Sequence, residues 1–180
     1  MHLPYSSDLL ARAARIRLIG FDVDGTLTDG RLQFDDNGRE SKSFHSQDGM
    51  GMVLLRESGI HTAIVTARIS PLVELRGKAL GVQHIHTHER RKLARMQAIA
   101  AEMEIGMDEV AFMGDDLPDL ATLRAVGLSI APADAHPWVL TEANWITPRN
   151  GGRGAARDAC DLLLAAHGKL DAILALGEHP

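Results

Sequence analysis

Two acidic residues, Asp22 and Asp24, stand one position apart where an apolar run ends in the sequence DVDGT. Such a pair repels itself, so it is unfavourable unless a proton or a cation offsets the charge. A second apolar run ends in GDDLPD at 114–119, which adds three more acids: Asp115, Asp116 and Asp119. Carboxylate ligands without a cysteine nearby favour a hard cation, and Mg²⁺, which recruits a substrate phosphate, fits best. The acids therefore predict a magnesium site.

Donors for a phosphate group follow at two further points of the chain. Thr66 and Arg68 come directly after the apolar run HTAIV, and Lys92 opens a stretch with helical spacing. An ammonium, a guanidinium and a hydroxyl are groups that bind phosphoryl oxygens. Together with a magnesium site, they predict chemistry on a phosphate ester.

Short apolar runs alternate with helical patterns, which predicts an α/β fold: a doubly wound, mainly parallel sheet with helices on both faces. The predicted strands cover 16–23, 61–67, 82–87 and 109–114, with edge strands at 127–131 and 144–147. The predicted helices cover 51–58, 70–80, 90–103, 117–126 and 154–168. In such sheets, ligands bind beyond the carboxyl ends of the strands. The acids and the phosphate donors follow predicted strands, so we expect them to meet in one crevice.

One segment, 31–45, does not fit this alternation. It has alternating apolar and polar residues on either side of DDNG, which predicts a β-hairpin with its turn at Asn37–Gly38. Its apolar residues would be exposed on a monomer. They are Leu32, Phe34 and Phe44. No repeat or linker divides the sequence, so 1–180 is predicted to form one domain, with the hairpin as an insertion and 169–180 as a C-terminal tail.

Composition narrows the functional classes. The 180 residues carry a net charge of −5 and only 4% aromatic residues, which argues against nucleic acid as a partner. No apolar run reaches the roughly 18 residues that span a bilayer, so no membrane partner is expected. The N-terminal sequence lacks the apolar core of a signal peptide, and Cys160 is the single cysteine. A cytoplasmic location is therefore expected.

In this order, DVDGT, IVTAR at 64–68, Lys92 and GDDLPD resemble the four motifs of the haloacid dehalogenase superfamily of phosphohydrolases. The resemblance implies that Asp22 attacks the phosphate and forms an aspartyl-phosphate. It implies that Asp24 protonates the leaving oxygen and then activates water. Thr66 and Lys92 match the residues that hold the transferring phosphoryl group. Of the two neighbouring aspartates, Asp22 is then the nucleophile and Asp24 the proton-transfer group.

The same resemblance assigns the cofactor site. It implies that Mg²⁺ is held by the side chains of Asp22 and Asp115 and by the backbone carbonyl of Asp24. Asp116 and Asp119 are expected beside these ligands, supporting them rather than binding the metal.

No cap domain is expected. Members of the superfamily with a mobile lid insert a whole domain between the first two motifs or between the second and third. Here a hairpin and a helix separate Asp24 from Thr66, and one helix and one strand separate Arg68 from Lys92. A neighbouring subunit is then the expected means of excluding water.

Among capless members, the chain resembles the family of 3-deoxy-D-manno-octulosonate 8-phosphate phosphatases. Besides GDDLPD, four stretches carry this resemblance: QDGMG at 47–51, ADAHP at 133–137, GGRGA at 151–155 and AHGKLD at 166–171. The resemblance implies hydrolysis of the eight-carbon sugar acid phosphate in lipopolysaccharide assembly. The family often has an arginine where this chain has Val53, and a relative that acts on a nine-carbon sialic acid 9-phosphate stays open as the alternative.

The family pattern also implies which residues meet the substrate, a phosphorylated sugar acid. Besides Asp24, they are His45, Ser46, Gln47, Asp48, Gly49, Arg68, Arg76 and Lys92. The two arginines exceed what the phosphate needs, and they suit the substrate carboxylate. The resemblance further implies a homo-oligomer, a tetramer, in which each hairpin helps to cover a neighbour's site. Arg153 in the GGRG stretch is expected to bring a cation to an active site, its own or a neighbour's.

Two classes without phosphatase activity share parts of this pattern. A response-regulator receiver domain also combines a doubly wound sheet, clustered aspartates and Mg²⁺, but its phospho-acceptor follows the third strand. Here that strand ends in HTH, with no aspartate. A non-catalytic scaffold would not need the pair of Asp22 and Asp24. The alternating His84, His86 and His88 lack a carboxylate or cysteine in their run to complete a zinc site.

Overall fold

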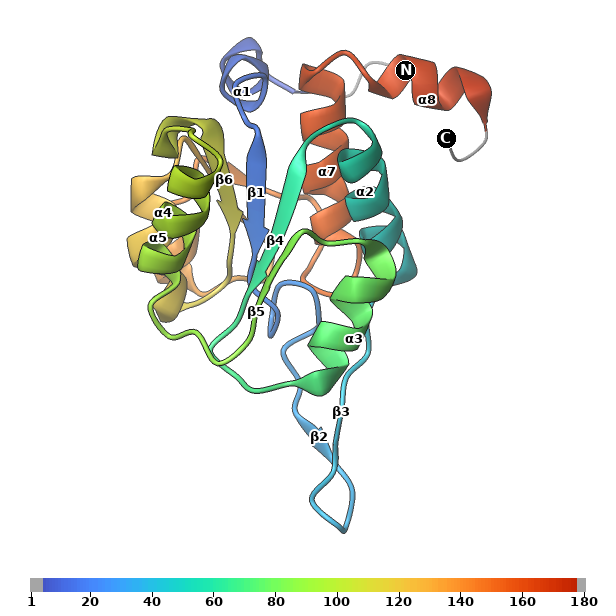
Figure 1. The fold of residues 1–180 in the computed structure, drawn as a ribbon, viewed down its shortest axis with the longest axis vertical. Coiled ribbons are helices and arrows are strands. Elements are labelled where there is room, and N and C mark those ends of the chain that lie inside the picture. Colours follow the sequence, from blue (N-terminus) through green and yellow to red (C-terminus); the bar gives the residue numbers. More distant parts are fainter. Residues whose placement is uncertain (1–4, 178–180) are drawn as a thin grey trace.

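The computed structural model describes residues 5–177, which fold around a sheet of six parallel strands (Figure 1). The strands are β1 (Leu18–Phe21), β4 (His61–Val65), β5 (His84–His86), β6 (Val110–Met113), β7 (Leu128–Ala131) and β8 (Trp145–Ile146). Their order is β5–β4–β1–β6–β7–β8. The predicted parallel sheet is confirmed. The predicted edge position of 127–131 is wrong, because β7 lies between β6 and β8.

Helices cover both faces of this sheet (Figure 1). One face carries α1 (Ser7–Ala13), α2 (Ser46–Glu57), α3 (Pro71–Leu80) and α7 (Ala155–Ala166). The other face carries α4 (Lys92–Glu102) and α5 (Leu120–Ala125). The shorter elements are η1 (Met107–Glu109), η2 (Leu117–Asp119), α6 (Pro137–Leu140) and α8 (Leu170–Leu176). Among residues 5–177, no helix has the length and apolar content of a membrane span.

Several helices differ from the sequence prediction, and the short helix α6 was not predicted. Helix α2 begins at Ser46 rather than at 51, because the glycines of QDGMG interrupt the apolar spacing that marks a helix. Helix α1 was not predicted; the Ser6 hydroxyl caps it by accepting a hydrogen bond from the backbone nitrogen of Leu9 at 3.2 Å. Helix α8 lies within the predicted tail, whose last residues, 178–180, lie outside the described residues.

Each face of the sheet packs its own apolar core, because successive side chains of a strand point to opposite sides. Ile19 and Phe21 of β1 pack in the core formed with α2 and α7, whereas Leu18 packs in the core formed with α4 and α5. All four residues of β1 are buried. A sheet buried on both faces is doubly wound, as predicted.

The central position of β1 decides where the site forms. Phe21, its last residue, is paired with Ile64 of β4 on one side and with Met113 of β6 on the other. The residues that follow these three strands therefore lie together at one edge of the sheet. In the described chain, only the hairpin and α2 lie between β1 and β4, and only α3 and β5 lie between β4 and α4, so the capless arrangement is confirmed.

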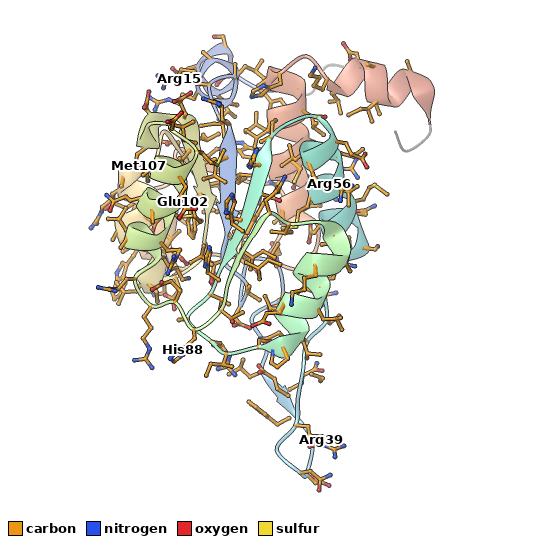
Figure 2. The ribbon with its side chains drawn as sticks, viewed as in Figure 1. Arg15, Arg39, Arg56, His88, Glu102 and Met107 are labelled. Carbon is orange, nitrogen blue, oxygen red and sulfur yellow. The ribbon has the colours of Figure 1, made fainter. Side chains whose placement is uncertain are left out.

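The predicted hairpin projects beyond the carboxyl end of the sheet (Figure 1), with Arg39 at its tip (Figure 2). Its strands are β2 (Gln33–Phe34) and β3 (Glu40–Ser41). Gly38 has a φ of 75°, a left-handed conformation that glycine adopts without strain. The Asp35 carboxylate accepts hydrogen bonds from the backbone nitrogens of Asn37 at 2.9 Å and Arg39 at 2.7 Å. The predicted turn at Asn37–Gly38 is confirmed.

The apolar residues of the hairpin are not equivalent. Leu32 is 49% exposed and Phe34 is 58% exposed. Phe44 is half-buried and packs against the core, because it lies just before His45, the N-cap of α2, and lines the same pocket as Leu27. The expectation that all three would be exposed on a monomer is therefore wrong for Phe44.

Candidate active site

A buried lysine joins two aspartates at the carboxyl edge of the sheet. The Lys92 ammonium, at the start of α4, lies 2.7 Å from Asp22 Oδ1 and 2.6 Å from Asp119 Oδ1. Its side chain is only 4% exposed. Burial alone would lower the pKa of Lys92, but the two carboxylates outweigh burial and raise it. Lys92 is therefore a permanent cation, and the place predicted for it from chain order is confirmed.

Asp115 completes a cluster of three acids with Asp22 and Asp119. Carboxylate oxygens of the three residues lie within 4.8 Å of one another. Thr26 donates a hydrogen bond from its hydroxyl to Asp115 Oδ1 at 3.1 Å. Asp119 Oδ2 accepts from the backbone nitrogens of Asp115 at 3.1 Å and Asp116 at 3.3 Å, while its Oδ1 meets Lys92. Both oxygens of Asp119 are thus engaged by the protein, so Asp22 and Asp115 are the better placed ligands.

The charge of this cluster fits a divalent cation. Burial raises the pKa of Asp22, the charge of Asp119 raises it further, and Lys92 opposes both. Burial and the charges of Asp22 and Asp119 raise the pKa of Asp115 to about 7. When all three acids are ionised, their negative charges face a single ammonium, that of Lys92, so the negative charge of the cluster is not balanced. An all-oxygen donor set with this deficit suits Mg²⁺.

We expect Mg²⁺ to stabilise the fold, and to do so more strongly as the pH rises. Without metal, the native state binds more protons at Asp115 than the unfolded chain does between about pH 4 and 7, so stability falls as the pH rises through this window. A cation at about 100 times its Kd adds about 2.7 kcal/mol, which is about 5–10 °C in Tm at this size. Thermal unfolding in EDTA and in Mg²⁺ at several pH values measures the difference. If the increase in Tm on adding Mg²⁺ were the same at every pH, the expectation would be contradicted.

The carboxylate of Asp24 lies apart from this cluster and faces the hairpin. The ammonium of Lys42 contacts Asp24 Oδ1, and Arg68 Nε lies 3.7 Å from Asp24 Oδ2. Arg68 also donates a hydrogen bond from Nη2 to Glu40 Oε1 at 3.0 Å. Lys42 and Glu40 were missed by the sequence analysis. Glu40, Lys42 and Phe44 alternate along the returning side of the hairpin, and this spacing was the signal that could have identified them.

Two further predicted residues lie where the strands end. Thr66 directly follows β4 and is buried, and its hydroxyl accepts a hydrogen bond from the backbone nitrogen of Arg68 at 3.3 Å. That bond uses the hydroxyl as an acceptor, so its hydrogen can point into the crevice. Asp116 is exposed, and its carboxylate caps η2 by accepting from the backbone nitrogen of Leu117 at 2.7 Å. Asp116 thus orders the loop that carries Asp115.

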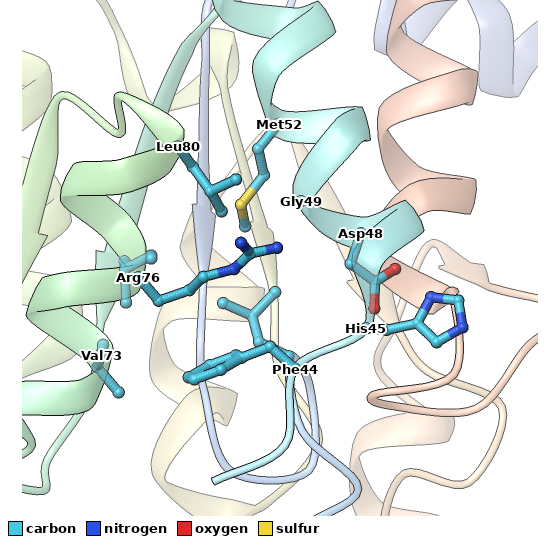
Figure 3. Close-up of a pocket in the computed structure, with 10 residues that line it drawn as sticks. Phe44, His45, Asp48, Gly49, Met52, Val73, Arg76 and Leu80 are labelled. Carbon is cyan, nitrogen blue, oxygen red and sulfur yellow. The ribbon is translucent and has the colours of Figure 1, made fainter.

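The residues predicted to meet the substrate separate into two groups. The first lines a pocket between α2 and α3 (Figure 3). Figure 3 shows Arg76 reaching from α3 toward Met52 and Gly49 of α2, above Phe44. A Cβ atom at Gly49 would lie 2.2 Å from Arg76 Nη2, so a side chain there would displace the guanidinium from this position. His45 lines the same pocket. Gly49 of the QDGMG stretch therefore leaves space for the Arg76 side chain.

The second group holds α2 against the start of α7. Asp48 is buried, and its Oδ1 accepts from the backbone nitrogen of Arg157 at 2.8 Å, which caps α7. Gln47 accepts a hydrogen bond from Arg149 Nη1 at 3.0 Å, and its neighbour Ser46 is exposed. These contacts are structural. A role of these three residues in substrate binding stays a prediction.

Arg153 lies on the loop before α7, at the rim of a second cleft. Its Nη2 lies 3.4 Å from Asp29 Oδ2, and its side chain is exposed. The cleft, of about 120 Å³, is also lined by Ser43 and His45. Arg153 is thus near the base of the hairpin, and its predicted role as a substrate cation stays a prediction.

His84 and His86 lie on β5, away from the acidic cluster. His84 stacks on His61, with ring centroids 6.1 Å apart and planes at 30°. Among residues 5–177, the cluster of Asp22, Asp115 and Asp119 is the one group of three or more acidic, histidine or cysteine side chains close enough to share an ion.

The chain is similar to known phosphatases over most of its length. A family model described as haloacid dehalogenase-like hydrolase matches residues 80–157. The chain is 44% identical over 168 residues to 3-deoxy-D-manno-octulosonate 8-phosphate phosphatase KdsC of Escherichia coli (strain K12), covering 93% of this chain and 89% of that protein. A crystal structure from Xanthomonas campestris has 49% identity and a TM-score of 0.93, covering 98% and 100% of the two chains.

A further crystal structure holds ligands. It is the 3-deoxy-D-manno-octulosonate 8-phosphate phosphatase of Moraxella catarrhalis in complex with a magnesium ion, a phosphate ion and a KDO molecule. It is 36% identical to this chain, with a TM-score of 0.94, and the match covers 97% of this chain and 100% of that one. The match to the Escherichia coli protein and those to the two crystal structures cover nearly the whole chain, so they include the strand ends that carry the aspartates.

Proposed function

The chain belongs to the family of 3-deoxy-D-manno-octulosonate 8-phosphate phosphatases, and we propose that it hydrolyses this phosphate monoester to the free eight-carbon sugar acid and phosphate. The observation that carries the proposal is the buried group of Asp22, Asp115 and Lys92 at the carboxyl edge of the sheet. It combines a nucleophile, an acidic cation site and a fixed ammonium. The reaction would serve lipopolysaccharide biosynthesis.

Phosphoryl transfer proceeds in two balanced steps. An oxygen of Asp22 attacks phosphorus, the bond from phosphorus to the sugar oxygen breaks, and that oxygen takes the proton of Asp24. Asp24, now a carboxylate, then takes a proton from a water whose oxygen attacks phosphorus, and the bond to Asp22 breaks. Phosphate leaves, and Asp24 is again protonated. Mg²⁺ at Asp22, Asp115 and the backbone carbonyl of Asp24 would offset the charges of phosphate and nucleophile.

Lys92 and Thr66 would hold the phosphoryl oxygens. An ammonium has three donors, and Asp22 and Asp119 use two of those of Lys92. The third can reach a phosphoryl oxygen without breaking either ion pair. This arrangement keeps the phosphorus in line with Asp22.

The substrate carboxylate would bind at the arginines. Within the described chain, no carboxylate forms an ion pair with Arg76, although its guanidinium is half-buried beside a pocket. A half-buried guanidinium of this kind favours an anionic group supplied by a ligand. Arg68 lies beside Asp24, on the side where the leaving group would depart. A nine-carbon sugar acid phosphate remains the second candidate, because Val53 stands where the family often has arginine.

A panel of phosphate esters tests this proposal. We expect the eight-carbon sugar acid phosphate to give the highest kcat/KM, a nine-carbon sialic acid phosphate to follow, and neutral hexose phosphates to be poorer by about 10-fold or more, since one lost buried ion pair costs at least 1.4 kcal/mol. EDTA should stop phosphate release, and added Mg²⁺ should restore it. A preference for neutral hexose phosphates would overturn the substrate assignment.

We also infer assembly into a homotetramer. Leu32 and Phe34 of the hairpin are exposed, and so is Leu75 of α3, at 69%. A hairpin with two-residue strands is marginal alone, and pairing between subunits would bury its apolar residues and cover its edges. A location in the cytoplasm is part of the same proposal, and the free, buried thiol of Cys160 is compatible with it.

Light scattering tests the assembly. We expect a tetramer at micromolar concentration, and the double variant Leu32→Glu, Phe34→Glu should dissociate it because the charges cannot be buried unpaired. Leu174→Glu, which places one such charge at an exposed apolar site on α8, is the control and should remain tetrameric. A fully active monomer would contradict the inference.

A further inference from the structure

The hairpin delivers a buried lysine to Asp24, and the mechanism above gives this lysine no role. The side chain of Lys42 is 2% exposed, although its neighbours Ser41 and Ser43 are exposed. Its ammonium contacts Asp24 Oδ1 and lies 3.1 Å from Glu40 Oε1. A buried ammonium is unfavourable unless carboxylates offset the lost hydration, and here two do so.

Arg68 extends this arrangement to four charges. Its Nη2 lies 3.0 Å from Glu40 Oε1, and its Nε lies 3.7 Å from Asp24 Oδ2. Each oxygen of Asp24 therefore faces a different cation, one from the hairpin and one from the end of β4. Glu40 accepts from both cations and fixes them relative to each other. The Lys42 contact on Oδ1 holds the carboxyl group in one orientation, and Oδ2, which Arg68 approaches only to 3.7 Å, stays available to carry the proton.

That orientation directs Asp24 away from the metal-binding acids. Its carboxylate is not part of the cluster of Asp22, Asp115 and Asp119. It faces Lys42, which also lines an open cleft of about 330 Å³ between the hairpin and α3. A proton donor must come within about 2.6–3.2 Å of the leaving oxygen, so the direction of the carboxylate matters for catalysis.

We propose that Lys42 is a positioning residue that holds the Asp24 carboxylate toward the leaving oxygen of the substrate. The inference rests on the proposed function, because it needs Asp24 as the proton donor. Lys42 acts through Asp24, and Glu40 keeps the Lys42 ammonium in place. Without Lys42, the Asp24 carboxylate turns toward Arg68 and reaches the leaving oxygen less often.

Two substrates of nearly equal shape isolate this effect. Phenyl phosphate releases a phenolate that needs a proton, since the pKa of phenol is about 10, as in tyrosine. The nitro group of p-nitrophenyl phosphate makes its phenolate a good leaving group without a proton. General acid catalysis contributes about 10²–10⁴-fold, so we expect Lys42→Met to lower kcat/KM about 10- to 100-fold for phenyl phosphate and less than about threefold for p-nitrophenyl phosphate.

Three single variants and one double variant serve as controls. Lys42→Arg keeps the cation and should restore most of the activity on phenyl phosphate. Arg39→Met removes an exposed cation from the tip of the same hairpin and should match wild type with both substrates (Figure 2). Like Lys42→Met, Asp24→Asn should lose more kcat/KM with phenyl phosphate than with p-nitrophenyl phosphate. The double variant Asp24→Asn, Lys42→Met should have the same kcat/KM as Asp24→Asn alone, because the two residues act as one unit.

Several results would overturn the proposal. Equal losses with both substrates would mean that Lys42 supports the fold of the hairpin, and additive losses in the double variant would mean that it acts independently of Asp24. If Lys42→Met does not fold, Glu40→Gln replaces it and must show the same preference in weaker form. A wild-type enzyme that cleaves aryl phosphates but not the sugar acid phosphate would refute the proposed function and leave this test intact.

Discussion

Asp22→Asn is expected to abolish phosphate release, with a loss in kcat/KM on the order of 10⁵-fold or more, as for removal of other enzymatic nucleophiles. An amide cannot attack phosphorus, so no aspartyl-phosphate forms. The ammonium of Lys92 still meets Asp119 at 2.6 Å, so the side chains around the substitution keep their partners. Phosphate release from the sugar acid phosphate, together with acid quenching to trap the phosphoenzyme, measures the effect.

The same variant should fold at least as well as wild type without metal. Asn removes one negative charge from a buried cluster in which burial and Asp119 already raise the pKa of Asp22. Its Tm in EDTA should therefore equal or exceed that of wild type. Asp171→Asn, an equal change at an exposed site on α8, should leave both activity and Tm unchanged. Wild-type turnover by Asp22→Asn would refute the covalent mechanism.

The meeting of the acids and the phosphate donors was predictable from sequence, for a topological reason. Parallel strands joined by helices have their carboxyl ends at the same edge, so residues directly after each strand must converge. Asp22, Thr66 and Asp115 each follow a strand by one or two positions, and local apolar runs locate those strands. No long-range contact had to be known to bring these residues together.

The contacts of Lys42 and Asp48 were not predictable in the same way. Lys42 and Asp24 are 18 positions apart in sequence, and the hairpin lies between them, so local sequence did not show that they would meet. Asp48 is predicted from QDGMG to meet the substrate, and its second contact, with the backbone nitrogen of Arg157 on α7, lies far along the chain and was not predicted. Local sequence does not encode which distant helix end a side chain will meet.

A second large effect is expected at a residue without a side chain. Gly25 has a φ of 93°, and a Cβ atom there would lie 2.0 Å from Asp115 Oδ2. The other side of this turn packs tightly against the loop at Gly151. The two backbones are so close that a Cβ atom on Gly151 would lie 1.8 Å from the Gly25 carbonyl oxygen, and the Gly152 backbone nitrogen donates a hydrogen bond to the Thr26 carbonyl oxygen. The turn therefore has no room to move away from Asp115. In Gly25→Ala the clash must therefore displace the Asp115 carboxylate. We expect Mg²⁺ affinity to fall about 10- to 100-fold, as for other disturbed metal sites, and kcat/KM to fall at least as much.

Gly59→Ala separates this clash from ordinary backbone strain. Gly59 has a φ of 83°, but a Cβ atom there would meet nothing within 4 Å. Both variants should lose about 1–3 kcal/mol of stability, because both force alanine into a left-handed conformation. Only Gly25→Ala should weaken Mg²⁺ binding, measured by calorimetry, and slow phosphate release at saturating Mg²⁺. If both variants bind Mg²⁺ as wild type does, the position of Asp115 tolerates the added methyl group, and the close approach of Gly25 does not limit the metal site.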